Sequence, residues 1–148
     1  MLKEYHIGAP FHCPVQPTSV LPMVHLDDLV LGLVALTDAP ASVLQEPQAG
    51  YALAGFSFSP QDLQNYLKSL PPLGASSSSA FDVTYDENSN AALSGAALFA
   101  ELWPNSLSGD AAARDLQWTP RLVPSLAAAV TRILAGHALR SKEGDGGV

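Results

Sequence analysis

The sequence is poor in basic residues and holds a single cysteine. Seven Lys and Arg side chains stand against fourteen Asp and Glu, so the 148 residues carry a net charge of −7. The basic side chains are scattered along the chain. This argues against nucleic-acid binding, because phosphate contacts need grouped Lys and Arg. As the one cysteine, Cys13 cannot form an internal disulfide, and it fits a reducing compartment.

Targeting and membrane-spanning signals are also missing. The N-terminal residues MLKEYHIGAP lack the charged start, apolar middle and cleavage site of a signal peptide, and they lack the Arg/Ser bias of a transit peptide. The longest apolar run near the C-terminus, residues 122–139, is amphipathic and is interrupted by Pro124, Arg132 and His137. It therefore predicts a buried helix, and no membrane association is expected.

The most informative segment that is present reads LPMVHLDDLVLGLVALTDAP, residues 21–40. Its apolar start predicts a strand over Pro22–Leu26, and the apolar periodicity that follows predicts a helix over Asp27–Thr37. Asp27 or Asp28 is expected to accept hydrogen bonds from the free N–H groups at the helix start. The side chains expected to face a core are Val24, Leu26, Leu29 and Leu33.

Strands and helices alternate along the rest of the chain. Further strands are predicted over Phe11–Val15, Tyr51–Phe56 and Phe81–Tyr85. Further helices are predicted over 60–70 after the N-cap Ser59, and over Asn90–Trp103, Asp110–Leu116 and Val123–Arg140. Four short strands are too few for a complete doubly wound domain, so an α/β fold of incomplete Rossmann-type architecture is expected. Its parts would be a truncated lead-in at 1–9, one lobe at 10–140 and a disordered tail at 141–148.

Five groups of residues carry a resemblance to a known family. They are Phe11–Cys13 with Leu21–Asp28, Tyr51–Leu53 with Ser57–Leu63, Phe81–Asp86, Trp103–Pro104, and Ala113–Trp118. In this order and spacing they resemble the NAD-dependent L-threonine 3-dehydrogenases of the extended short-chain dehydrogenase and epimerase type. The resemblance runs from about Pro10 to Leu134. It implies the C-terminal, substrate-binding lobe of such an enzyme.

The resemblance also implies a reaction and a location. Enzymes of this family oxidise L-threonine to 2-amino-3-ketobutyrate and pass the hydride to NAD, and the eukaryotic members are mitochondrial. The family's glycine-rich cofactor turn lies near the start of the enzyme, and its Tyr-x-x-x-Lys pair lies mid-chain. This sequence has neither, since the fourth residues after its tyrosines are Ala9, Gly55, Leu70 and Ser89. We therefore expect no catalytic, NAD-binding or metal-binding residue on the chain, and no activity without the cofactor half.

Other interpretations stay open. The chain could be a truncated, non-catalytic remnant, or a fragment that associates with a full-length subunit through the exposed face of the helix that begins at Asp27. It could also be a lobe of a nucleotide-sugar epimerase, although such a lobe usually offers Arg or Lys for the diphosphate. An apolar helix face left uncovered predicts poor solubility or dependence on a partner.

Trp103, which precedes Pro104, is the candidate substrate-binding residue. The resemblance implies that its ring closes over the amino-acid substrate L-threonine and excludes water. The alternative is a core tryptophan at the end of a helix. The second tryptophan, Trp118, is expected to pack in the core.

The acidic candidates favour structural roles. Asp27 and Asp28 point about 100° apart on a helix, so they are expected to cap it rather than to form an acid/base pair. His25 and Asp27 share a strand face, but no nucleophile in a fitting context accompanies them. Arg114 and Asp115 could grip a substrate carboxylate, yet a local surface ion pair is the preferred interpretation.

The remaining histidines and the cysteine show no catalytic pattern. His6, His12 and His137 lack the spacing of zinc ligands. Cys13 follows His12 on a predicted strand, where neighbours point to opposite faces. A buried, inert thiol is therefore expected, not a catalytic dyad.

Overall fold

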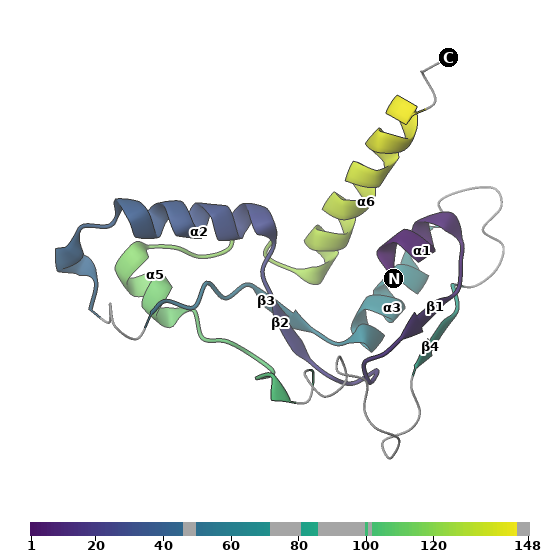
Figure 1. The fold of residues 1–148 in the computed structure, drawn as a ribbon, viewed down its shortest axis with the longest axis horizontal. Helices are drawn as coiled ribbons and strands as arrows, with labels where there is room; N and C mark the ends of the chain where they lie inside the picture. The colour runs from purple at the N-terminus through teal and green to yellow at the C-terminus, as the bar shows by residue number, and fades with distance from the viewer. Residues whose placement is uncertain (46–49, 72–80, 86–99, 101, 145–148) are drawn as a thin grey trace.

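The computed structural model describes residues 1–45, 50–71, 81–85, 100 and 102–144. Its helices are α1 (Leu2–Ile7), α2 (Leu26–Asp38), α3 (Pro60–Ser69), α5 (Asp110–Leu116) and α6 (Leu126–Gly144), with a 3-10 turn η1 (Ala41–Val43). Its strands are β1 (Phe11–Cys13), β2 (Leu21–Met23), β3 (Phe56–Phe58) and β4 (Val83–Tyr85). In Figure 1, α2 and α5 lie at one end, and α1, α3 and the β1–β4 pair at the other. The β2–β3 pair connects the two ends, and α6 projects away from them.

The described strands form two short sheets. β1 pairs in parallel with β4, with Phe11 opposite Val83. β2 pairs antiparallel with β3, with Leu21 opposite Phe58. This mixture of helices and strands, with a small parallel sheet, confirms the α/β class predicted from the sequence.

The strand predicted over Tyr51–Phe56 is wrong in position, because β3 begins only at Phe56. Leu53 instead packs on the core around Trp118. Gly55 lies directly against the end of β2, where an added Cβ would stand 2.3 Å from the carbonyl oxygen of Met23. Pairing with β2 therefore starts just after the glycine that permits this close approach.

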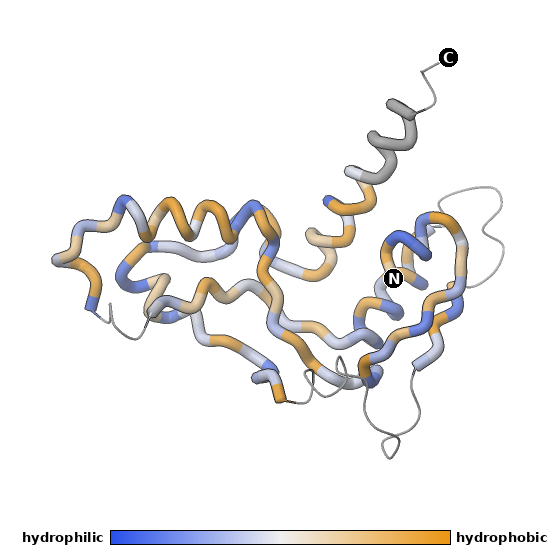
Figure 2. Tube along the Cα trace, in the orientation of Figure 1, coloured by the Kyte–Doolittle hydropathy of each residue, from blue (hydrophilic) through white to orange (hydrophobic). Residues whose placement is uncertain are grey.

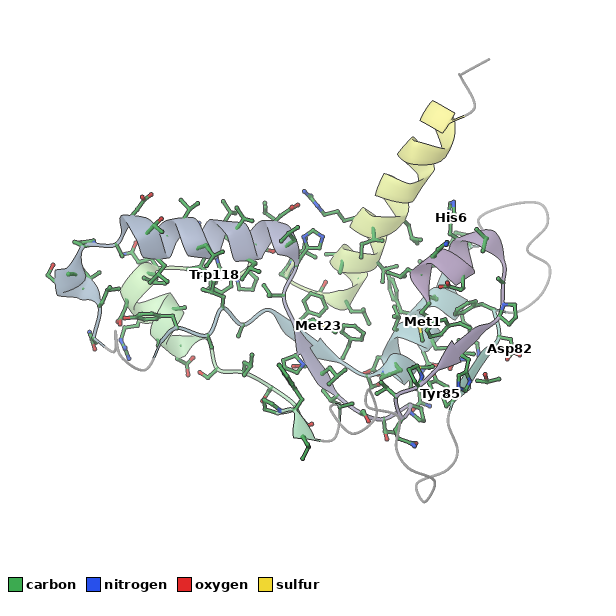
Figure 3. All side chains as sticks on the ribbon, in the orientation of Figure 1. Met1, His6, Met23, Asp82, Tyr85 and Trp118 are labelled. Atoms are coloured by element: carbon green, nitrogen blue, oxygen red, sulfur yellow. The ribbon has the colours of Figure 1, made fainter. Side chains whose placement is uncertain are left out.

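A buried cluster around Trp118 joins α2 to α5. Figure 3 shows Trp118 beneath α2. This residue is 6% exposed, and its indole N–H donates a hydrogen bond to the carbonyl oxygen of Asp28 at 3.2 Å. Partly buried apolar residues pack against the cluster: Val24, Ala35, Leu36, Ala39, Leu44, Tyr51 and Leu53. The prediction that Trp118 is a core residue is confirmed.

The start of α3 agrees with the prediction. The Ser59 hydroxyl accepts a hydrogen bond from the backbone N–H of Asp62 at 3.1 Å, and the Asp62 carboxylate accepts one from the Ser59 N–H at 2.8 Å. With Pro60 at the first helical position, these residues form a reciprocal capping box. Hydrogen bonds from the backbone and side chain of Ser59 lower the pKa of Asp62 below its ordinary value. Residues close in sequence thus fix where α3 begins.

The start of α2 differs from the prediction. Its N-cap is His25, whose Nδ1 accepts a hydrogen bond from the backbone N–H of Asp27 at 3.3 Å. The prediction that Asp27 or Asp28 caps this helix is therefore wrong. Asp28 is 1% exposed and turns away from the helix end toward residues 121–123.

The inner face of α2 is also different from the expected one. Leu26 and Leu33 are predicted to face the core, but they are 67% and 49% exposed. The buried positions of α2 are Asp28 and Gly32, four residues apart on one face of the helix. Because this face packs inward, the large side chains on the other faces point outward.

The two terminal helices differ from the sequence prediction in their extent. α1 lies within the expected lead-in and ends at Gly8, whose φ of 69° is a left-handed value that favours glycine. α6 begins at Leu126 rather than at Val123, after Pro124, and it continues to Gly144 instead of ending at Arg140. The helix predicted over Asn90–Trp103 falls mostly outside the described residues. None of the helices in the described ranges is long and apolar enough to cross a membrane.

Candidate functional site

Trp103 lies on the surface. It is 53% exposed, in contrast to the buried Trp118. The alternative predicted from the sequence, in which Trp103 packs in the core, is therefore wrong. An exposed indole is free to contact a ligand or another protein surface, so substrate binding by Trp103 stays a prediction.

His25, Asp27 and Arg132 form a polar group where α2 meets α6. The carboxylate of Asp27 makes an ion pair with the guanidinium of Arg132, and its distance to His25 Nδ1 is 3.8 Å. That distance is too long for a hydrogen bond, and the same Nδ1 already caps α2. The three side chains therefore connect two helices, in agreement with the structural role predicted for His25 and Asp27.

Asp28 is a buried carboxylate whose hydrogen bonds come from the backbone of a distant segment. Its oxygens accept backbone N–H bonds from Arg121 at 2.9 Å, Leu122 at 3.0 Å and Val123 at 2.7 Å. Burial opposes ionisation of this carboxyl group, but the three bonds outweigh burial and lower the pKa of Asp28. Sequence reasoning did not find these partners, because no local pattern marks residues more than 90 positions away.

Arg114 and Asp115 form the predicted ion pair, with Arg114 Nε 2.6 Å from Asp115 Oδ1. The pair is not merely a surface feature, since the Asp115 side chain is 1% exposed. Its carboxylate also accepts hydrogen bonds from the Tyr51 hydroxyl at 2.7 Å and from the backbone N–H of Gln45 at 3.0 Å. Asp115 thus binds the chain on both sides of residues 46–49, at Gln45 and at Tyr51. No local sequence pattern marks these two partners, which lie 70 and 64 positions away.

The ionised form of Asp115 should contribute to stability. The hydrogen bond that Arg114 donates has the largest effect on the pKa of Asp115, and it lowers that pKa. Burial acts in the opposite direction, but further hydrogen bonds from Tyr51 and Gln45 help to hold the pKa of Asp115 well below its ordinary value of 3.8. Below about pH 4 the unfolded chain therefore binds more protons than the folded chain, and stability falls as the pH falls. Asp115→Asn should lower the Tm at neutral pH. The difference in Tm between the wild type and this variant should become smaller as the pH falls from about pH 5 to pH 2.

Circular dichroism melts across this pH range check the expectation for Asp115. Asp38→Asn is a matched control, because it makes the same charge change at an exposed position and should leave the neutral-pH Tm nearly unaltered. A Tm gap for Asp115→Asn that stays constant with pH would contradict a stabilising ionised carboxylate.

An apolar cavity of about 180 Å³ lies between α1, β2, β3, α3 and α6. Of its described lining residues, only His25 has a polar side chain. The ammonium and carboxylate groups of an amino acid would be buried there without partners, at a high cost in free energy. The cavity is therefore a gap in apolar packing and does not suit L-threonine.

The structure places Cys13 and His12 as predicted. Cys13 is buried and His12 is exposed on opposite faces of β1, and His12 Nδ1 lies 3.1 Å from the Thr84 hydroxyl of β4. The side chain of His137 lies outside the described residues. Within the described part of the chain, no group of three His, Cys, Asp or Glu residues could hold a metal ion.

The fold matches part of solved threonine dehydrogenases of the epimerase-like, short-chain type. The GalE-like L-threonine dehydrogenase from Cupriavidus necator in its holo form aligns with 90% of this chain at a TM-score of 0.75 and 25% identity, and the match covers 39% of that chain. The enzyme from Trypanosoma brucei aligns with 91% of this chain at a TM-score of 0.64 and 25% identity. The predicted fold class is confirmed.

Curated proteins give the same result at the level of sequence. The mitochondrial L-threonine 3-dehydrogenases of Sus scrofa and Bos taurus are 29% and 28% identical to this chain over 134 residues. The match covers 89% of this chain and 31% of each relative, so the chain spans about a third of their length. No family model matches it. The chain resembles the C-terminal part of L-threonine 3-dehydrogenase, as the five sequence motifs predict.

Proposed function

We propose that this chain is the substrate-binding part of an NAD-dependent L-threonine 3-dehydrogenase and that it is catalytically incomplete by itself. The observation that carries this proposal is the backbone match over 90% of the chain to the Cupriavidus necator enzyme. In the complete enzyme, L-threonine would be oxidised to 2-amino-3-ketobutyrate. The mitochondrial relatives support a mitochondrial location.

The residues present do not fit NAD. The sequence has no glycine-rich turn to seat a pyrophosphate and no Tyr-x-x-x-Lys pair to deprotonate the substrate hydroxyl. The apolar cavity offers a pyrophosphate no donor besides the His25 ring. NAD binding and proton transfer are therefore assigned to the part of the enzyme that this chain does not match.

A chimera tests the proposed function. In it, this chain replaces the matched region of the Cupriavidus necator enzyme, and NADH formation is followed with and without L-threonine. Threonine-dependent NADH is expected from the chimera and not from the 148-residue chain alone. A chimera that folds and binds NAD, yet reduces it at the same rate without threonine, would contradict the proposal.

Trp103 can be tested in the same chimera. Trp103→Ala should raise the KM for L-threonine by about tenfold with a smaller change in kcat, because the indole contributes apolar contact to the bound substrate. Trp103→Phe should retain most of the affinity. Leu102→Ala is the control, since Leu102 is 76% exposed and adjacent. An unchanged KM for a folded Trp103→Ala variant would remove Trp103 from the substrate site.

A further inference from the structure

The apolar cavity between α1, β2, β3, α3 and α6 is large for a gap inside a domain. Its volume is about 180 Å³, whereas few voids in protein interiors exceed the size of a water molecule. Engineered apolar cavities of about 150 Å³ stay dry and bind benzene. The space therefore matches a molecule with one six-membered ring.

Two phenylalanine rings form one wall of the apolar cavity. Phe56 and Phe58 are alternate residues of β3, so both side chains project from the same face of the strand. Their rings are stacked, with centroids 5.9 Å apart and an interplanar angle of 27°. A planar ring beside them gains the offset or edge-to-face contacts that aromatic pairs prefer. This wall therefore favours an aromatic occupant.

The wall on α6 is made of smaller side chains. Ala129 and Val130 line the cavity and are 9% and 1% exposed. In Figure 2 the first turns of α6 are coloured mostly hydrophobic. Because the side chain of Ala129 ends at its Cβ, it leaves room that a longer side chain would fill. Ala129 is therefore a position at which one substitution can close the cavity.

The lining does not suit a charged ligand. Among the described lining residues only His25 has a titratable side chain, and its Nδ1 accepts the hydrogen bond from the Asp27 N–H. A ring that makes this bond is neutral, since a protonated imidazole has no acceptor nitrogen. The nearby charges of Asp27 and Arg132 pair with each other. An ionised ligand would therefore lose its water without gaining a counter-ion, at a high cost in free energy.

Contacts outside the cavity hold its walls in place. β2 pairs with β3 in the register that sets Met23 opposite Phe56. The capping box at Ser59 fixes the start of α3, and the Arg132 ion pair ties α6 to α2. Collapse of the cavity would have to disturb one of these contacts, so the space is preformed for a ligand. The cavity is also partly open, so a ligand can enter it without unfolding the chain.

We propose that the apolar cavity binds a small, uncharged aromatic molecule with one six-membered ring, of about the size of toluene. The volume sets the size of the ligand, the two phenylalanine rings favour its aromatic ring, and the lining excludes a charge. This inference goes beyond the proposed function, since such a molecule is neither the substrate nor the cofactor of a threonine dehydrogenase. A bound ring would join α6 more firmly to the β2–β3 pair.

Thermal unfolding of the 148-residue chain with and without toluene tests the site. Toluene near its solubility limit should raise the Tm by about 2 °C or more, because a ligand that binds only the folded state stabilises that state. Benzoate at the same concentration should leave the Tm unchanged, because it has the same ring with a negative charge.

A matched pair of variants locates the effect of toluene. Ala129→Leu should fill the cavity and abolish the rise in Tm. Ala127→Leu is the control, because it makes the same change at an exposed position of α6, and it should keep the rise. No rise in the wild type, an equal rise with benzoate, or an equal rise in folded Ala129→Leu would each overturn the proposal.

Methyl NMR spectra of the wild-type chain give a second measurement, which decides the matter if Ala129→Leu does not fold. Toluene should shift the methyl signals of Leu63, Val130 and Ile133, which line the cavity, in a saturable manner. The signals of Val43 on η1, which is not a lining residue, should stay in place. Shifts that miss the three lining residues, or that are as large at Val43, would rule out a site in the cavity.

Discussion

Asp28→Ala is expected to lower the free energy of unfolding by about 3 kcal/mol or more. The change removes the acceptor of three backbone N–H bonds, from Arg121, Leu122 and Val123. Asp28 is 1% exposed, and the Val123 bond is itself buried, so water cannot easily replace the carboxylate. Urea unfolding followed by circular dichroism measures the loss.

The neighbouring aspartate provides the control for Asp28. Asp27→Ala removes only a partly exposed ion pair with Arg132, and it should cost about 0.5 kcal/mol or less. Asp28→Asn should fall between the two, since the amide keeps one acceptor oxygen but turns an NH2 donor toward backbone donors. Equal costs for Asp27→Ala and Asp28→Ala would show that the bonds from residues 121–123 contribute nothing to stability.

Gly55→Ala is expected to destabilise the fold by about 3 kcal/mol. An added Cβ would stand 2.3 Å from the carbonyl oxygen of Met23 and 2.9 Å from the Cα of Val24. Both atoms belong to the backbone, so no flexible side chain can move aside. To relieve this clash, β3 has to move away from β2, and the pairing of these two strands connects the two ends of the molecule.

Gly136→Ala is the matched control for Gly55→Ala. Nothing lies within 4 Å of a Cβ at Gly136, which is inside α6. Alanine there should leave stability unchanged or raise it by up to about 1 kcal/mol, because it favours the helix more than glycine does. The urea midpoint should therefore fall for Gly55→Ala and stay the same or rise for Gly136→Ala. A Gly55→Ala midpoint equal to that of the wild type would mean that the 54–56 backbone shifts at little cost.

Features with local causes could be predicted from the sequence. The capping box of α3 depends on Ser59, Pro60 and Asp62, which are close together in the chain, and the structure has it as predicted. The α/β class and the likeness to threonine dehydrogenase followed from short motifs in a fixed order. The capping box depends on residues within one segment, and the likeness depends on the order of the motifs along the chain. Both can be seen in the sequence alone.

The orientation of α2 could not be predicted, because its cause is distant in sequence. Apolar residues occur around the helix, so periodicity alone does not choose which side faces inward. The choice depends on Asp28, which finds its partners near Val123, and on Gly32, which admits Leu53 and Trp118. The packed face of α2 thus includes its smallest residue and a carboxylate. A large separation in sequence also hid the hydrogen bonds that Tyr51 and Gln45 donate to Asp115.

The long reach of Asp28 has a consequence for synthesis on the ribosome. Its partners lie 93 to 95 residues further along the chain. Asp28 therefore leaves the ribosome well before the N–H groups that will bind it, and α2 cannot take its final position until residue 123 has emerged. During that interval the inward side of α2, at Asp28 and Gly32, lacks Trp118 and residues 121–123, so it is exposed together with the side that faces solvent in the folded chain. A nascent chain in this state is prone to aggregation. Exposure of the inward side should end once residues 118–123 are available to α2.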